Sequence, residues 1–223
     1  MKPSKSEEEI EREKREKREK RILEAPSFID RQMRLAGVPS KFIGKGYLLS
    51  EKFEDFKTEF LNGLPCGLFL SGNAGVGKTT MACRTLEEIL RWIYIECYRW
   101  GSEINFINYP RFIMSLQDMY RKDKNEQSVF DYLEEISKSD LLVIDDLGAE
   151  KLTDFVRQCT YFLINEREMY ERSTIITSNY SLEKLADQID DRIASRISGM
   201  CKTLNFKGRD KRVKNNPSEN RTD

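Results

Sequence analysis

Residues 72–79 read Gly72-Asn73-Ala74-Gly75-Val76-Gly77-Lys78-Thr79, and this stretch decides the fold because it matches the pattern G-x-x-x-x-G-K-[ST]. An apolar run at 66–71 precedes it, and residues 78–100 have helical periodicity. A strand, a glycine-rich turn and a helix in this order form a phosphate-binding loop, or P-loop. Its glycines let successive backbone N–H groups turn inward around phosphate oxygens at the positive end of a helix.

The P-loop predicts a nucleotide site with a magnesium ion beside it. The Lys78 ammonium can reach the β- and γ-phosphates, and the Thr79 hydroxyl can ligate magnesium. The candidate nucleotide-binding residues are those of the loop and of the helix start: Gly72, Asn73, Ala74, Gly75, Val76, Gly77, Lys78, Thr79 and Thr80.

Two further predicted strands lead into polar residues. Leu-Leu-Val-Ile at 141–144 precedes Asp145 and Asp146, and Thr-Ile-Ile-Thr at 174–177 leads through one serine into Asn179. The carboxyl ends of parallel strands meet at one edge of a sheet, beside the P-loop. We therefore expect Asp145 to hold magnesium, Asp146 to polarise the attacking water, and Asn179 to lie near the γ-phosphate.

Strand and helix signals alternate along the rest of the chain. β-prone runs lie at 104–107 and 203–206, and helical patterns lie at 110–121, 127–137, 153–170 and 190–199. Continuous apolar strands that alternate with helices indicate a parallel sheet covered on both faces. The predicted fold class is therefore α/β with a P-loop core.

Arg192 and Arg196 are spaced i,i+4 and share one face of the helix predicted at 190–199. They are either surface arginines bridged to Asp190 or Asp191, or they include an arginine finger that reaches the γ-phosphate of a neighbouring subunit.

The N-terminal stretch 7–21 holds seven Glu, seven Lys or Arg and one Ile, so it has almost nothing to bury. We expect a charged arm, helical or disordered, that ends at Ala25-Pro26. It is either a solvated segment or a helix that binds a partner. The predicted organisation is this arm at 1–24, linker helices at 25–57, the nucleotide-binding domain at 58–207 and a basic, flexible tail at 208–223.

The amino-acid composition narrows the chemistry that the chain can perform. Its 223 residues include 38 Lys or Arg, 38 Asp or Glu and no His. The lack of His excludes a Ser-His-Asp triad and a His-ligated metal, whereas phosphate chemistry needs neither. The five cysteines form no C-x-x-C pair, which favours reduced thiols. Without a long apolar segment, the sequence predicts a soluble, cytoplasmic protein that does not span a membrane.

In order and spacing, these elements resemble the AAA+ ATPases, and in particular the helicase-loader branch named for DnaC, with the transposition helper IstB as close kin. The resemblance rests on AGVP at 36–39, VIDDLGAE at 143–150, TSNYSLEKL at 177–185, DRIASRI at 191–197 and LNFKGRDKR at 204–212. It covers about residues 30–213.

The resemblance implies a five-stranded parallel sheet in the order 5-1-4-3-2, ATP hydrolysis, and self-association into a ring or spiral. The family's functional motifs fall on residues already named: Walker A on Lys78 and Thr79, Walker B on Asp145 and Asp146, and sensor 1 on Asn179. Arg196 matches the family's arginine finger better than Arg192 does.

Two features depart from the family pattern. Most AAA+ proteins have Glu at the position of Asp146, so hydrolysis is expected to be slow and stimulated by DNA or a partner. The helical lid that usually follows the core is missing or vestigial, because about 22 residues remain after Cys201. Arg212 is the candidate there for a sensor 2 arginine, a role that stays open.

By resemblance, the chain places a DnaB-type replicative helicase on single-stranded DNA, with ATP and Mg²⁺ as cofactors. Residues 110–138 take the place of a helix that touches DNA in the loader branch, or they form a solvated face; they include Tyr120, Arg121, Lys122 and Lys124. Three alternatives stay open: an IstB-like transposition helper that recruits a transposase, a small-molecule kinase on a P-loop core, and an ATP-gated scaffold without hydrolysis.

Overall fold

A parallel sheet of five strands forms the centre of the protein, whose computed structural model describes residues 7–44, 50–96, 102–123 and 126–211. The strands are β1 (Gly67–Gly72), β2 (Ile104–Asn108), β3 (Leu141–Leu147), β4 (Ser173–Ser178) and β5 (Lys202–Phe206). Their order is β2-β3-β4-β1-β5, so the predicted order 5-1-4-3-2 is confirmed. Because every neighbouring pair is parallel, all strands end at the same side, which we call the carboxyl edge; the opposite side is the amino edge.

Apolar side chains on both faces explain why these runs form a buried sheet. In β1, Leu68 and Leu70 belong to one buried cluster, whereas Phe69 between them belongs to another. Because side chains alternate between the faces of a strand, a continuous apolar run needs cover on each face.

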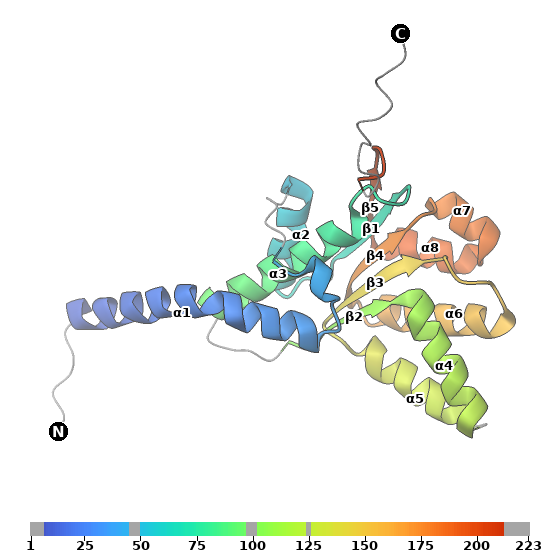
Figure 1. Cartoon of the computed structure of the whole chain (residues 1–223), viewed down its shortest axis with the longest axis horizontal. Helices are drawn as coiled ribbons and strands as arrows, with labels where there is room; N and C mark the ends of the chain where they lie inside the picture. The colour runs from blue at the N-terminus through green and yellow to red at the C-terminus, as the bar shows by residue number, and fades with distance from the viewer. Residues whose placement is uncertain (1–6, 45–49, 97–101, 124–125, 212–223) are drawn as a thin grey trace, which may run out of the picture.

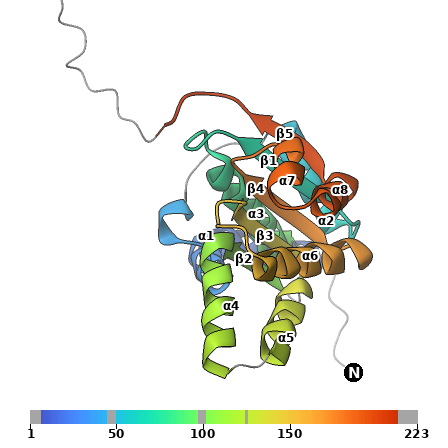
Figure 2. The ribbon, with the colours of Figure 1, turned by 90° about the vertical axis from the view of Figure 1, so that its right-hand side faces the viewer.

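The helices form two layers, one on each face of the sheet (Figures 1 and 2). One layer holds α1 (Glu7–Leu35), the short 3-10 helix η1 (Ser40–Phe42), α2 (Glu51–Leu61) and α3 (Lys78–Glu96). The other holds α4 (Tyr109–Asp123), α5 (Glu126–Ser137), α6 (Asp154–Met169), α7 (Leu182–Gln188) and α8 (Asp191–Met200). The four helices predicted between residues 110 and 199 are confirmed as α4, α5, α6 and α8, with ends that differ by one or two residues.

The first helix, α1, continues through Pro26, so the prediction that the charged stretch ends at Ala25-Pro26 is wrong. Proline inside a helix removes one hydrogen bond and crowds the carbonyl four residues earlier. Packing offsets this cost, because Ala25 and Ile29 are buried in the same cluster as residues of α3. Arg18 adds a 2.6 Å ion pair to Glu96 at the end of α3. Tertiary contacts therefore determine the length of α1.

Four aromatic residues lie in the stretch 92–100 near the end of α3. Tyr94 stacks on Phe28 of α1, with ring centroids 4.1 Å apart. Trp92 is 38% exposed, and Tyr98 and Trp100 lie outside the described residues. Within one chain, therefore, Tyr94 belongs to the contact between α1 and α3.

Two expectations from composition can be compared with the described part of the chain. The cysteines found there are all free and buried: Cys66, Cys83, Cys159 and Cys201. No helix in that part combines the length and the apolar character needed to cross a bilayer.

Candidate nucleotide-binding site

The P-loop lies at the carboxyl edge, between the end of β1 and the start of α3. Gly72, Gly75 and Gly77 have positive φ angles of 141°, 75° and 105°, which glycine adopts without the strain that a Cβ would cause. At Gly72 a Cβ would also come within 2.2 Å of the Phe206 carbonyl oxygen. The shape of the loop therefore depends on its glycines, and it leads directly into the N-terminus of a 19-residue helix.

The Lys78 side chain is buried, and its ammonium donates to three oxygen atoms around the loop. Nζ lies 2.7 Å from the carbonyl oxygen of Gly72, 2.8 Å from that of Asn73, and 2.9 Å from Oδ1 of Asn179. These acceptors are uncharged, and an anionic oxygen forms a stronger hydrogen bond with the same ammonium. Lys78 is thus held inside the site by partners that a phosphate can replace.

Asp145 is buried at the carboxyl edge and gathers hydroxyl groups from two other elements. Its Oδ1 accepts hydrogen bonds from Thr79 Oγ1 at 2.7 Å and from Thr177 Oγ1 at 2.8 Å. Its Oδ2 lies 3.4 Å from Nδ2 of Asn108. Mg²⁺ prefers oxygen ligands and is usually bound through one or two protein groups together with water and phosphate. The adjacent oxygens of Thr79 and Asp145 therefore fit this ion.

Asp146 has a φ of 63°, which is uncommon for a residue with a side chain. Its N–H donates to Thr177 Oγ1 at 2.9 Å, and its Oδ1 accepts from Asn179 Nδ2 at 2.8 Å. The pairing of β3 with β4 shifts register between Ile144 and Leu147, so regular pairing is interrupted here. Strained backbone that surrounding contacts hold in place is a feature of functional sites.

Asn179 joins the two halves of the site. Its Oδ1 accepts from Lys78 of the P-loop helix, while its Nδ2 donates to Asp146 near the end of β3. The sheet order explains this, since β4 lies between β1 and β3. Together with Thr177, five residues predicted from the sequence form one connected hydrogen-bond network: Lys78, Thr79, Asp145, Asp146 and Asn179.

The two arginines of α8 lie outside this network. Arg192 forms a 3.0 Å ion pair with Asp190, the surface bridge that the sequence left as an alternative. Arg196 donates from Nε to Asn165 Oδ1 at 3.0 Å and from its NH2 nitrogen to Tyr161 OH at 2.9 Å. Both guanidinium groups lie over the Tyr161 ring. Within one chain, the predicted finger is therefore attached to α6 rather than to the P-loop.

Three of the residues predicted to contact DNA, Tyr120, Arg121 and Lys122, lie on α4. Tyr120 is 39% exposed, and its ring centroid lies 6.0 Å from that of Phe155. Arg121 and Lys122 are exposed, while Lys124 and the sensor 2 candidate Arg212 lie outside the described residues. The described part of this patch is thus open to solvent.

Two contributors to the site were missed by the sequence analysis. Thr177 links the two aspartates, and the only local signal for it was a hydroxyl residue near the end of the strand before Asn179. The second contributor is the segment after β5, where the Lys211 N–H donates to the Gly75 carbonyl oxygen at 3.0 Å. No pattern in the sequence pairs these two distant residues.

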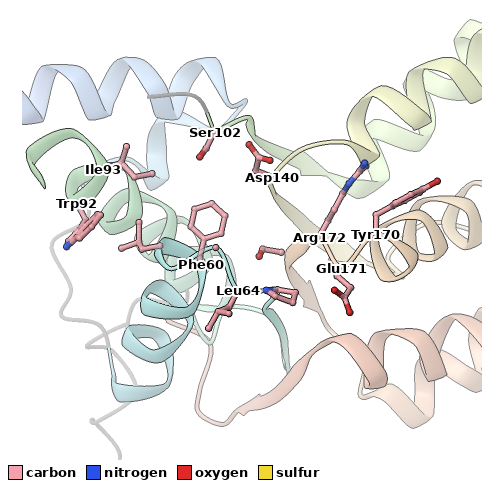
Figure 3. A pocket seen from close by; sticks show the side chains of 13 residues that line it. Phe60, Leu64, Trp92, Ile93, Ser102, Asp140, Tyr170, Glu171 and Arg172 are labelled. Atoms are coloured by element: carbon pink, nitrogen blue, oxygen red, sulfur yellow. The ribbon is translucent and has the colours of Figure 1, made fainter. Parts of the chain in front are cut away.

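A pocket of about 640 Å³ opens at the other edge of the sheet (Figure 3). Asp140 and Arg172, which precede β3 and β4, line it together with Phe60, Trp92 and Tyr170. None of the residues predicted for the nucleotide site borders this pocket. The pocket and the P-loop network are therefore separate features at opposite edges.

Comparison with protein families gives one match over most of the chain. A model of the family described as IstB-like ATP binding protein matches residues 64–218. The replicative helicase loader DnaI of Bacillus subtilis (strain 168) is 28% identical over 120 residues, which make up 53% of this chain and 35% of DnaI. The replicative helicase loader DnaC of Escherichia coli (strain K12) is 22% identical over 146 residues, which make up 66% of this chain and 55% of DnaC. The chain thus matches only about a third to a half of the length of these relatives.

Solved structures agree with the fold. A crystal structure of the DnaC helicase loader is 26% identical with a TM-score of 0.59, covering 76% of this chain and 100% of that one. The replication initiator DnaA bound to AMPPCP and single-stranded DNA is 19% identical with a TM-score of 0.60, covering 77% of this chain and 51% of that one. The DnaA likeness is one of fold alone.

Proposed function

The chain belongs to the IstB-like ATP-binding proteins, a DnaC/IstB-like family of AAA+ ATPases, and from this premise we propose that it hydrolyses ATP while placing a replicative helicase on single-stranded DNA. One observation carries the proposal: the Asn179 amide bridges Lys78 and Asp146. The group that binds phosphate and the group that orients water are thereby linked through a single side chain.

Each residue of the network has a role in this reaction. The P-loop N–H groups and Lys78 bind the phosphates of ATP and fix their position. Thr79 and Asp145 would hold Mg²⁺, which neutralises negative charge on the phosphate oxygens. Asp146 and Asn179 orient the attacking water. Because Asp146 is one methylene shorter than Glu, we expect slow hydrolysis that DNA or a partner stimulates.

The arginine finger comes from a second copy of the chain in this proposal. Arg196 is bound to Asn165 and Tyr161 of α6 and does not reach the P-loop network of its own chain. A guanidinium that completes a neighbour's site makes hydrolysis depend on assembly. We therefore propose self-association into a ring or spiral, with Arg196 as the finger and Arg192 fixed at the start of α8 by Asp190.

A mixing experiment tests this mechanism. The Lys78→Ala variant lacks ATP binding but keeps the finger, whereas the Arg196→Ala variant binds ATP but lacks the finger. Each alone should hydrolyse ATP at less than about one hundredth of the wild-type rate with single-stranded DNA present. An equimolar mixture should recover turnover, because finger and P-loop then meet on different chains.

Arg192→Ala is the matched control, because it removes an arginine from the same helix face. It should retain most of the turnover. Wild-type turnover in Arg196→Ala would contradict the role of Arg196 as the arginine finger. A mixture of Lys78→Ala and Arg196→Ala that is no more active than either variant alone would contradict it too. A wild-type chain without affinity for ATP would contradict the proposed function itself.

The partner is the second part of the proposal. DnaI and DnaC carry the name of replicative helicase loaders, whereas the family description points to IstB. We favour a DnaB-type helicase, because a DnaC structure aligns over its whole length with this chain. Affinity capture with and without ATP should recover the helicase in a nucleotide-dependent way, and Lys78→Ala should lose that dependence. Recovery of a transposase without helicase would favour the transposition helper.

Contact with DNA is assigned to α4. Arg121 and Lys122 are exposed beside the partly exposed Tyr120 ring, an arrangement suited to backbone charge and base stacking. The logarithm of the affinity for single-stranded DNA falls linearly with the logarithm of the salt concentration. The double variant Arg121→Ala/Lys122→Ala should make this slope shallower by about 0.7 for each phosphate that the two side chains neutralise. Lys202→Ala is a suitable control, because Glu59 already pairs with that ammonium at 2.6 Å.

A further inference from the structure

The segment after β5 returns to the P-loop, and we call residues 207–211 the strap. β5 lies beside β1 (Figure 1) and pairs with it up to Phe206 opposite Gly72. The chain therefore leaves the sheet next to the start of the P-loop. Lys211 then donates its N–H to the carbonyl oxygen of Gly75 at 3.0 Å.

The strap approaches the loop closely because the loop residues it meets are glycines. A Cβ on Gly75 would lie 1.7 Å from Oδ1 of Asp210, so the carboxylate packs directly against the glycine backbone. A Cβ on Gly77 would lie 3.8 Å from Nζ of Lys211. Two successive strap residues thus face two glycines of the phosphate-binding motif.

The hydrogen bond to Gly75 indicates which side of the loop the strap covers. The N–H groups of a P-loop converge on the phosphates. In a planar trans peptide the carbonyl oxygen points away from the N–H. A segment bound to the Gly75 carbonyl therefore lies on the outer side of the P-loop and leaves open the inner side, where the N–H groups face the phosphates.

We propose that the strap is a positioning element of the nucleotide site, which holds Gly75 in its phosphate-binding conformation through the Lys211 N–H. This inference rests on the proposed binding of ATP. A loop fixed before its ligand arrives loses less conformational freedom on binding, so its affinity is higher. By linkage, bound nucleotide stabilises the strap to the same extent. The stability of the hydrogen bond at Lys211 thus depends on whether nucleotide is bound.

Proline substitution isolates the backbone hydrogen bond. Lys211→Pro removes both the N–H and the ammonium, whereas Lys211→Ala removes only the ammonium. In the full chain with Mg²⁺, Lys211→Pro should bind AMPPCP about five-fold more weakly than Lys211→Ala by calorimetry, the effect of one net hydrogen bond. For hydrolysis, the difference should appear in KM rather than in kcat. Equal affinities of the two variants would overturn the inference while leaving ATP binding intact.

Hydrogen exchange tests the strap in the wild-type chain. The Lys211 amide should exchange more slowly when AMPPCP and Mg²⁺ are bound, whereas the Cys201 amide, which donates to Ile197 O, should not change. An unchanged exchange rate at Lys211 would mean that nucleotide has no effect on the strap, and a faster rate would mean that nucleotide displaces it. Either result would overturn the inference. If the wild type binds no nucleotide, the proposed function is wrong instead. In that case the amides of residues 73–77 can be compared in the two variants without nucleotide. Faster exchange in Lys211→Pro than in Lys211→Ala would still establish that the strap holds the loop.

Discussion

Each edge of the sheet holds a buried cation that donates to uncharged oxygen atoms, yet the two cations have different roles. At the carboxyl edge, Lys78 is 6% exposed; its acceptors include the carbonyl oxygens of Gly72 and Asn73 and the side-chain oxygen of Asn179. At the amino edge, Arg167 is fully buried; it donates to the carbonyl oxygens of Ser137, Ser139 and Ser173 and to the hydroxyl of Thr174.

The difference lies in the acceptors. Those of Arg167 belong to the end of α5, to the turn between α5 and β3, and to the start of β4, so they are part of the framework of the fold. Burial lowers the pKa of Arg167 to about 9, because desolvation disfavours its charge, and the group stays charged at neutral pH. The acceptors of Lys78 belong to a glycine-rich loop and one amide. A buried cation is thus structural when its partners are fixed and functional when its partners can be exchanged.

The largest expected effect is on stability at the amino edge. Arg167→Met should lower the free energy of unfolding by about 3–5 kcal/mol, because the carbonyl oxygens of Ser139 and Ser173 lose their buried donor and that of Ser137 keeps only Arg172. Urea denaturation measures this loss. Nucleotide affinity of the folded variant should change less than about two-fold, since the nucleotide site lies at the opposite edge.

Arg172→Met is the matched control. Arg172 also donates to the Ser137 carbonyl oxygen but is only partly buried. Its loss should lower the free energy of unfolding by no more than about 1 kcal/mol, because water can reach the group left behind. Equal losses for the two variants would mean that burial of the guanidinium is unimportant.

Lys78→Ala should show the opposite pattern. We expect ATP affinity to fall at least about 100-fold, because the ammonium that binds the phosphates is absent. The free energy of unfolding should change by less than about 1 kcal/mol, because Gly72 is only partly buried and Asn73 is exposed, so water can replace the lost donor at their carbonyl oxygens. Calorimetric titration and urea denaturation of the same preparation measure both. If Lys78→Ala lowered the free energy of unfolding as much as Arg167→Met does, Lys78 would have a structural role like that of Arg167.

Asn179→Ala sharpens the comparison within the carboxyl edge. It should lower the rate of hydrolysis by about 100-fold, since Asp146 loses the amide that orients it. ATP affinity should stay within about three-fold, because Lys78 keeps its backbone acceptors. Steady-state turnover and equilibrium binding separate the two effects. Ser178→Ala is the control, because that hydroxyl donates to Leu147 O outside the network; an equal loss of turnover there would argue for a general disturbance.

Sequence analysis was more informative for the carboxyl edge than for the amino edge. The P-loop is a local pattern, and the rule that parallel strands end together gathers Asp145, Asp146 and Asn179 without further information. Arg167 follows Leu163 and Ile164 at helical spacing on the buried face of α6. The oxygens that satisfy it come from other segments, so the helix pattern alone cannot distinguish a buried arginine from a surface one.

Long-range contacts explain the other differences from the sequence prediction. Pro26 signals the end of a helix locally, yet packing of α1 on α3 keeps the helix intact. The strap belongs to a polar, basic stretch typical of a flexible tail, yet Lys211 binds Gly75. In both cases a weak local preference is outweighed by partners distant in sequence, and no spacing rule connects them.

The smallest expected effect concerns Arg192, a cation with a charged partner. Its side chain is 65% exposed and pairs with Asp190, the N-cap of α8. The hydrogen bond from Arg192 lowers the pKa of Asp190 to about 2, from an ordinary value of 3.8. A carboxyl with a lowered folded-state pKa stabilises the fold above its unfolded pKa and loses that contribution as pH falls through the folded value. This contribution should therefore be lost between about pH 4 and pH 2, and Arg192→Met should weaken that acid dependence.

At pH 7, Arg192→Met should lower the free energy of unfolding by less than about 1 kcal/mol, far less than Arg167→Met, although only Arg192 has a carboxylate partner. Solvent screens the exposed pair, and water replaces the guanidinium when it is removed. At Arg167 no water takes its place beside the buried carbonyls. A loss at Arg192 equal to that at Arg167 would mean that the charge of the partner, not the burial of the acceptors, governs stability. The distinction between the two edges would then need a different physical basis.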